Sequence, residues 1–167
     1  MTTPRCILGI DPGLAITGYG VLEFTHARPI VCEAGIIRTA DDNASDMAEK
    51  VLSVYKGVVE VIAQFKPESM AVEQLYAHYD HPRTAILMGH ARGVIFLAAA
   101  QAGIPVLSYA STQVKKIVTG NGRASKEQVQ RTIQRELGLA TIPDPPDVAD
   151  ALAVALCHYY QSKMQLT

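Results

Sequence analysis

The chain has 167 residues, 49% hydrophobic and 19% charged, with a formal net charge of −1, which suits a single domain over residues 1–167 whose core needs no metal or disulfide staple. Three cysteines without a CxxC spacing favour free thiols in a reducing cytoplasm over a disulfide scaffold or a zinc site. No uncharged apolar run reaches the roughly 18 residues of a membrane span, and a near-neutral charge argues against a protein that coats nucleic acid by bulk electrostatics, so we expect a cytoplasmic protein with no membrane association.

Three strands are predicted at the start of the chain. An apolar run ends at a Pro-Gly turn, and two further strand-like runs are separated by a turn at His26–Pro29. The three runs form a plausible antiparallel meander. Its strands are expected at residues 5–11, 16–26 and 30–39.

The middle of the chain alternates helices with strands. Apolar residues at helical spacing from Met47 to Phe65 predict a helix that ends at Lys66-Pro67, with Asp42 or Asn43 as its N-cap. The elements expected next are a strand at 69–73, a helix at 83–102 closed by Gly103, and a strand at 104–108.

The last third of the chain is predicted to be helical. A short helix at 111–118 and a flexible loop at 120–122 precede a helix that starts at Ser125, where Gln128 has the spacing of a capping box. A final helix is expected at 147–161. The order of elements predicts one α/β domain in which helices cover a mixed sheet.

Basic residues concentrate between Ser111 and Arg135, against a single acidic residue, Glu127. The rest of the chain is net acidic. Two interpretations stay open: the segment binds a polyanion locally, or it is an ordinary solvated helix face. The six basic residues are Lys115, Lys116, Arg123, Lys126, Arg131 and Arg135.

Four acidic residues occupy positions that acids usually avoid. Asp11 and Glu73 each end an apolar strand, and Asp147 and Asp150 lie on one face of an otherwise apolar helix. Turn chemistry, a solvent-exposed strand end and helix capping are alternative explanations for the first three. Asp150 is harder to explain in this way, because a charge on a buried helix needs a partner and no basic residue near it in the sequence is an obvious one.

The four carboxylates converge if the two strands are neighbours and the last helix crosses their ends. Such a cluster stays ionised only when cations offset its repulsion. Hard oxygen ligands without histidine or thiolate favour Mg²⁺ or Mn²⁺ over zinc. Two such ions about 4 Å apart are suited to in-line attack on a phosphodiester, so the pattern predicts metal-dependent phosphodiester hydrolysis.

Five motifs in order and spacing resemble the RuvC family, the bacterial Holliday-junction resolvases. They are ILGIDPGLAITGYGVLE, AVEQLYA, GHARGV, QVKKIVTGNGRASKEQV and PDVADALAVALCH, and the likeness runs from about Ile7 to His158. The resemblance implies a ribonuclease H-like mixed five-stranded sheet flanked by helices. It also implies paired nicks in four-way junction DNA, in recombination and repair, with two Mg²⁺ per site (or Mn²⁺).

The resemblance also implies roles for individual residues. The acidic tetrad of the family falls on Asp11, Glu73, Asp147 and Asp150, and all four are acidic here. Its junction-facing aromatic corresponds to Tyr76, and the basic pair of its DNA channel to Lys115 and Lys126. We expect the other two basic residues near the predicted loop, Lys116 and Arg123, to contact DNA as well.

Two features are left outside this assignment. Where the family commonly has a lysine-bearing segment, this chain has His78, Asp80 and His81, which should weaken phosphate contact there. Arg92 could equally be a helix salt bridge, and we assign it no catalytic role.

The symmetry of a four-way junction predicts a homodimer, because two related nicks need two related sites. We expect part of the helix at 83–102 to form the interface, and the resemblance implies a RuvA–RuvB branch-migration complex as a partner. This helix has more large apolar residues than one side of a sheet needs to bury, namely Ile86, Leu87, Val94, Ile95 and Leu97.

Three other functions are compatible with parts of the pattern. DPGLAITGYG is also similar to the first phosphate loop of actin-like ATPases, although 167 residues leave no room for their second lobe. A YqgF-type nuclease that processes RNA would keep the fold, and a junction-binding protein without chemistry would keep the substrate.

Overall fold

A mixed five-stranded sheet forms the centre of the computed structural model, which describes residues 5–25, 28–39, 46–75 and 80–165. The strand order is β3-β2-β1-β4-β5, with β1, β2 and β3 antiparallel and with β4 and β5 parallel to β1. The predicted meander and mixed sheet are therefore confirmed. The strands are β1 (Arg5–Asp11), β2 (Ile16–Phe24), β3 (Ile30–Arg38), β4 (Ser69–Glu73) and β5 (Val106–Tyr109).

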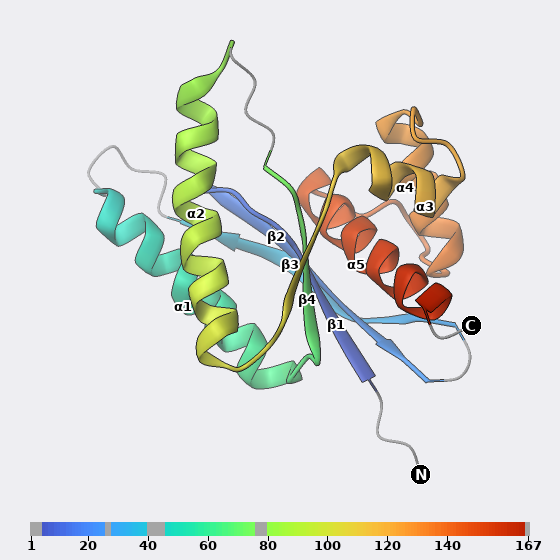
Figure 1. Ribbon diagram of the computed structural model, residues 1–167, viewed down its shortest axis with the longest axis horizontal. Coiled ribbons are helices and arrows are strands. Elements are labelled where there is room, and N and C mark those ends of the chain that lie inside the picture. The colour runs from blue at the N-terminus through green and yellow to red at the C-terminus, as the bar shows by residue number, and fades with distance from the viewer. Residues whose placement is uncertain (1–4, 26–27, 40–45, 76–79, 166–167) are drawn as a thin grey trace.

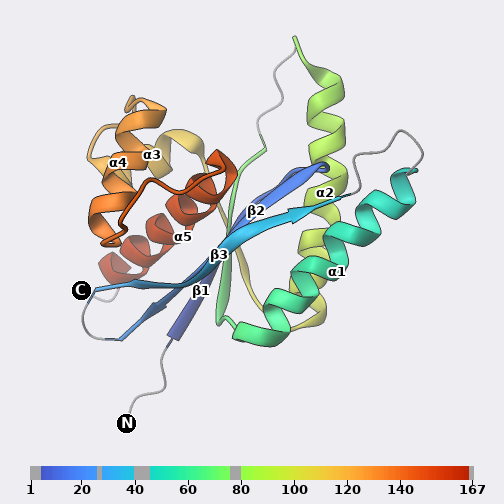
Figure 2. The same cartoon turned by 180° about the vertical axis from the view of Figure 1, so that it is seen from behind.

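Helices cover both faces of the sheet, as Figures 1 and 2 show. Two helices, α1 (Met47–Phe65) and α2 (Pro82–Gln101), pack against each other on one face. The helices of the other face are α3 (Ser111–Thr119), α4 (Lys126–Glu136) and α5 (Pro146–Gln165).

The helix ends follow local capping rules, with one correction. Asp46 caps α1 by accepting a hydrogen bond of 2.8 Å from the backbone N–H of Glu49. The prediction of Asp42 or Asn43 as the cap was therefore wrong, and both lie outside the described residues. The predicted capping box of Ser125 and Gln128 is confirmed.

Alternate residues of the central strands supply two separate cores. In β1, Ile7 faces the core under α5, whereas Leu8 faces the core under α1 and α2. Both side chains are fully buried. A sheet covered on both faces explains why the central strands read as nearly continuous apolar runs.

Helix α2 is long and apolar enough to cross a membrane, by length and composition alone. It is the one helix of the described ranges that passes this test, and only 22% of its apolar window is buried. A single such helix is weak evidence for a membrane span. Much of its apolar surface is therefore accessible on the outside of the domain.

Candidate active site

The four predicted acidic residues come from three elements that meet at one edge of the sheet. Strands β1 and β4 are parallel neighbours, so their carboxyl ends, with Asp11 and Glu73, lie at the same edge. Asp11 also pairs with Gly18 of β2, which lies directly beneath Asp147 at the start of α5. The neighbouring strands that the convergence required are thus present.

Two glycines let α5 approach the sheet this closely. A Cβ at Gly9 would lie 2.1 Å from the backbone oxygen of Ala151, and a Cβ at Gly18 would lie 2.2 Å from that of Asp147. No side chain fits in either space, so the backbone of α5 rests directly on β1 and β2. The close contact places the acidic first turns of α5 beside Asp11.

A buried three-residue network holds the far end of α5. The imidazole of His158 contacts the hydroxyl of Ser69 at 3.0 Å through Nε2 and that of Tyr109 at 2.6 Å through Nδ1. These contacts connect α5 to β4 and to β5. Glu73 is the last residue of β4, and Tyr109 of β5 pairs with it in the sheet.

Asp11 experiences the strongest electrostatic effect of the site. Burial, together with repulsion from Asp150, Asp147 and Glu73, raises the pKa of its carboxyl to about 8, although Lys126 opposes the shift. Each of the other three predicted acids therefore lies near enough to repel Asp11.

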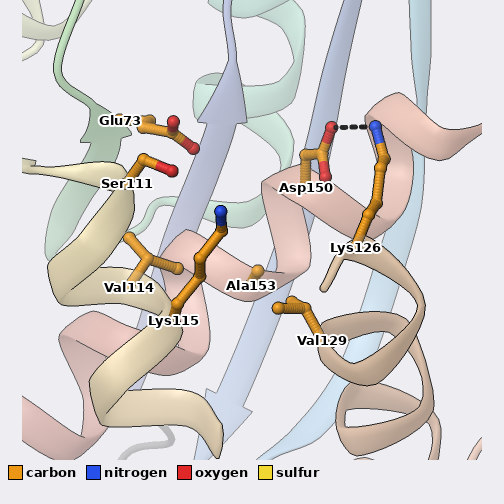
Figure 3. A pocket seen from close by; sticks show the side chains of 8 residues that line it. All are labelled: Glu73, Ser111, Val114, Lys115, Lys126, Val129, Asp150 and Ala153. Atoms are coloured by element: carbon orange, nitrogen blue, oxygen red, sulfur yellow. Dashed lines mark hydrogen bonds and ion pairs between the residues drawn. The ribbon is translucent and has the colours of Figure 1, made fainter. Parts of the chain in front are cut away.

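The pocket in Figure 3 lies between two of these acids. Glu73 and Asp150 lie on opposite sides of it, and the ammonium group of Lys115 points into the space between them. The cavity measures about 230 Å³. Its lining residues are Glu73, Ser111, Val114, Lys115, Lys126, Val129, Asp150 and Ala153.

Asp150 has a partner that the sequence did not reveal. The Nζ atom of Lys126 lies 3.3 Å from Oδ2 of Asp150, and the Asp150 side chain is 34% exposed. Burial raises the pKa of Asp150, and the ion pair opposes that shift. The expectation that Asp150 lacks a basic neighbour holds along the chain but fails in space, because α4 packs against α5.

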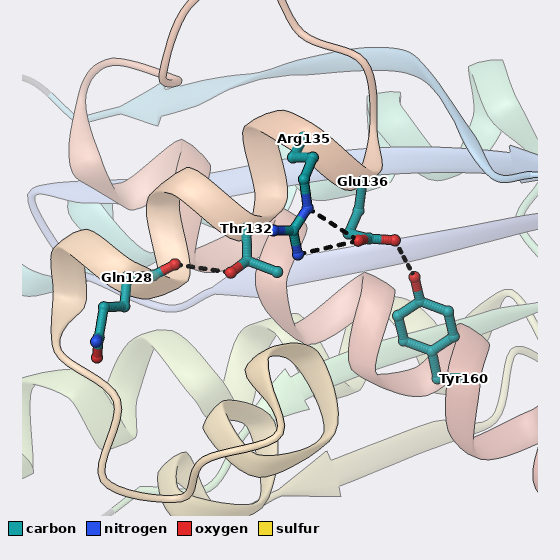
Figure 4. A network of polar contacts seen from close by, with 5 residues as sticks. All are labelled: Gln128, Thr132, Arg135, Glu136 and Tyr160. Atoms are coloured by element: carbon teal, nitrogen blue, oxygen red, sulfur yellow. Dashed lines mark hydrogen bonds and ion pairs between the residues drawn. The ribbon is translucent and has the colours of Figure 1, made fainter.

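Contacts between α4 and α5 fix the helix that begins at Lys126 (Figure 4). The hydroxyl of Tyr160 in α5 donates a 2.8 Å hydrogen bond to Glu136, whose carboxylate also pairs with Arg135 at 3.3 Å. In α4 itself, Thr132 donates to the backbone oxygen of Gln128. These contacts anchor the end of α4 that lies farther from Lys126.

Glu73 interacts with a residue that sequence analysis missed. Burial and repulsion from Asp150 raise the pKa of Glu73, while a hydrogen bond from the Ser111 hydroxyl and the charges of Lys115 and Lys126 lower it. Ser111 is the first residue of α3. Its place directly after β5, whose end lies beside the end of β4, is the signal that could have identified it.

The donor set of this edge suits a hard divalent cation. The four acids offer carboxylate oxygens, and burial together with repulsion from the other three acids raises the pKa of Asp11 although Lys126 opposes the shift. In the described ranges, no group of three or more His, Cys, Asp or Glu side chains is close enough together to hold an ion as arranged here. The four acids thus share one electrostatic environment without forming a ready-made cage.

The predicted DNA-contacting residues differ in their placement. Lys115 and Lys126 line the pocket, whereas Lys116 and Arg123 are exposed outside its lining. Tyr76 and His78 lie outside the described residues, while Asp80 and His81 are exposed just before α2. The sequence segment from Ser111 to Arg135 thus contributes two cations to the pocket itself.

The predicted interface helix exposes part of its apolar surface. Ile86 is 62% exposed and Leu97 is 49% exposed, but Ile95 is fully buried in the core with α1. The side chain of Ile95 therefore faces the sheet, whereas Ile86 and Leu97 stay accessible for an interface. A groove between α1 and α2 adjoins this surface, lined by Ala48, Val51, Leu52, Tyr55, Val94 and Leu97.

Comparisons with known proteins agree on one family. The family model described as "Crossover junction endodeoxyribonuclease RuvC" matches residues 7–158. A protein of that description from Rhodopirellula baltica is 52% identical over 155 residues, covering 93% of this chain and 86% of the relative. Another from Desulforamulus reducens is 49% identical over 152 residues, covering 91% of each chain.

A solved structure extends the likeness to three dimensions. The T. thermophilus RuvC in complex with Holliday junction substrate superposes with a TM-score of 0.89 at 34% sequence identity. The superposition covers 96% of each chain.

Proposed function

The chain belongs to the RuvC family of crossover junction endodeoxyribonucleases, and we propose from its site how it resolves Holliday junctions. The ribonuclease H-like fold that the sequence predicted is confirmed. The observation that carries the proposal is geometric: the ends of β1 and β4, with Asp11 and Glu73, meet the first turns of α5, with Asp147 and Asp150, at one edge of the sheet. We propose that Asp11, Glu73, Asp147 and Asp150 are the catalytic residues.

These four carboxylates would hold divalent metal ions. We propose two Mg²⁺ per site, with Mn²⁺ as a substitute, because the four donors are hard carboxylate oxygens, which match those ions. When bound, such ions activate water and stabilise the leaving oxygen of a phosphodiester. The carboxylates themselves act as ligands and not as general bases.

The residues around the pocket orient these ligands and attract the substrate. Ser111 lines the pocket beside Glu73, where its hydroxyl favours the charged form of that carboxylate. Lys115 projects into the pocket between Glu73 and Asp150, where its charge favours entry of a phosphate group. The side chains thus combine a negative ligand set with a cation directed at the scissile strand.

DNA contacts extend beyond the pocket. We propose Lys115, Lys116, Arg123 and Lys126 as phosphate contacts, because all four belong to the basic segment that adjoins the site. Tyr76, three residues after Glu73 in the sequence, is proposed to stack on a base of the junction.

A homodimer is supported by the surface of α2. Ile86 and Leu97 expose large apolar side chains, and an apolar groove runs beside them between α1 and α2. Contiguous apolar surface of this kind marks protein interfaces. Arg83 and Arg92 interrupt the apolar sequence of α2. We therefore interpret its apolar surface as a contact between two copies and not as a membrane span.

Family membership supports the remaining assignments. We propose that the enzyme acts in the cytoplasm as a single domain, with a RuvA–RuvB branch-migration complex as its partner. The family model and the 52% identical relative favour this function over an actin-like nucleotide-binding module or a YqgF-type RNA nuclease.

The proposed function is tested with labelled four-way junction, linear duplex and structured RNA, each with and without Mg²⁺. We expect paired symmetric nicks in the junction alone, and no cleavage in EDTA. Asp11→Asn and Asp147→Asn should each lower the cleavage rate by about 10³-fold or more while junction binding stays unchanged, because they remove metal ligands and not phosphate contacts. Asp144→Asn, an exposed aspartate just before α5, is the matched control. Loss of junction binding in both site variants would contradict the ligand role.

A further inference from the structure

Arg92 contacts the end of β4 from the face of the sheet opposite to α5. It lies in α2, and its Nη1 atom donates a hydrogen bond to the main-chain carbonyl of Glu73. The salt bridge considered from the sequence is not among the ion pairs of the described residues, although the charge of Glu73 acts on Arg92.

The carbonyl of Glu73 that Arg92 binds lies just beyond the pairing of β4 with β1. The paired residues of β1 and β4 end at Ile10 and Val72, so Glu73 lies one position beyond the last pair. On the other side, the N–H of Gln74 donates to the backbone oxygen of Tyr109 at 2.8 Å. The peptide group between Glu73 and Gln74 is therefore held at its oxygen by Arg92 and at its nitrogen by β5.

Arg92 is itself fixed in place. Its guanidinium lies 4.9 Å from the centroid of the Phe96 ring, within the range of a cation–π contact. The neighbouring Ala91 and Ile95 are fully buried and anchor this part of α2 in the core. A planar group held by stacking and by a hydrogen bond loses little further freedom when it positions another residue.

We propose that Arg92 is a positioning residue that sets the orientation of Glu73 in the metal site. The inference rests on the proposed function, in which Glu73 is a metal ligand. Arg92 binds the backbone of Glu73, and the Glu73 carboxylate lines the pocket on the α5 face. Fixing the last peptide group of β4 therefore fixes the point from which this carboxylate projects.

The test measures Mn²⁺ binding without DNA, by electron paramagnetic resonance of the free ion. Arg92→Met keeps an unbranched apolar stem but removes the guanidinium donors, and we expect it to weaken Mn²⁺ binding by about 10-fold. Arg92→Lys retains a charged donor and should recover at least part of the loss. Arg83→Met, at an exposed position in the first turn of α2, is the matched control and should bind Mn²⁺ as the wild type does.

A double-mutant comparison separates positioning from a general loss of structure. If Arg92 acts through Glu73, adding Arg92→Met to Glu73→Gln should produce no further loss of Mn²⁺ affinity. Equal losses in both backgrounds, or wild-type binding by folded Arg92→Met while Glu73→Gln is weakened, would overturn the inference. Wild-type Mn²⁺ binding by Glu73→Gln would instead overturn the proposed ligand role of Glu73. Thermal melts of each variant identify any that fail to fold, and Arg92→Lys then carries the comparison.

Discussion

The two faces of the sheet are built from the same strands but meet different demands. On the α5 face, Asp11 and Glu73 project toward a helix whose backbone touches the strands. On the other face, the preceding residues, Ile10 and Val72, enter an apolar core under α1 and α2. One face therefore needs atoms fixed in position, whereas the other needs mainly apolar area.

The largest expected difference between the faces concerns glycine. Gly18→Ala should destabilise the protein by about 3 kcal/mol, because its Cβ would collide with the backbone of Asp147, which cannot move without shifting α5. It should also reduce cleavage, since Asp147 would be displaced. Chemical denaturation and a cleavage assay check both effects.

Gly57→Ala on α1 is the matched substitution on the other face. Its Cβ would meet the side chain of Ile37 at 2.6 Å, and a side chain can repack. The gain in helix propensity, about 1 kcal/mol, offsets part of that cost, so Gly57→Ala should cost far less than Gly18→Ala. Equal costs would show that α5 is no more tightly constrained than α1.

The interface proposed on α2 is tested by placing a charge on the exposed apolar surface of this helix. Leu97→Glu should convert the proposed dimer to a monomer in analytical ultracentrifugation, because an unpaired carboxylate would be buried in the proposed interface. Ile30→Glu, at a residue of β3 that is 56% exposed, is the control and should leave the dimer intact. A wild-type protein that sediments as a monomer at micromolar concentration would contradict the assignment of this face.

Asp11, on the α5 face of the sheet, should make the metal-free protein less stable at high pH. Because the pKa of Asp11 is raised to about 8 in the folded state, unfolding releases its proton between about pH 4 and 8, and stability falls across this window as pH rises. Asp11→Asn removes this penalty and should be more stable than the wild type by about 1–3 kcal/mol at pH 8.5 in EDTA, with little difference near pH 4.

Melting curves as a function of pH, with and without Mg²⁺, measure this effect. Added Mg²⁺ should stabilise the wild type more than the Asn variant and so narrow the gap between them. A gap that is the same at pH 4 and at pH 8.5 would show that the ionisation of Asp11 is not its cause.

The smallest expected effect concerns Lys115. Lys115→Ala should weaken junction binding and lower the slope of its salt dependence by about one counterion. Lys56→Ala, on an exposed position of α1, should leave the slope unchanged. An unaltered slope in Lys115→Ala would argue that its ammonium does not contact a phosphate.

Local sequence signals predicted most of the fold. The strand at Ser69–Glu73 and the Ser125 capping box depend on neighbours in the chain and were placed correctly. The start of the last strand was predicted two residues too early, at Ile104 and not at Val106. The N–H of Ile104 donates to the backbone oxygen of Ala99 and so caps the end of α2.

Contacts between distant residues were out of reach. Asp150 and Lys126 are 24 residues apart, and Arg92 and Glu73 are 19 apart, so no periodicity joins them. The acidic residues themselves could be selected because a carboxylate at the end of an apolar run is unusual. Their cationic partners could not, because lysine and arginine are ordinary at exposed helix positions.

The ion pair between Lys126 and Asp150 has a consequence for the metal-free state of the protein. The ammonium of Lys126, on a flexible side chain, is a counter-ion for Asp150. Without bound metal, the protein itself therefore supplies part of the charge that neutralises the site. If Asp150 is a metal ligand as proposed, a divalent ion would replace Lys126 as the partner of its carboxylate, and the lysine would then be free to contact DNA at the pocket.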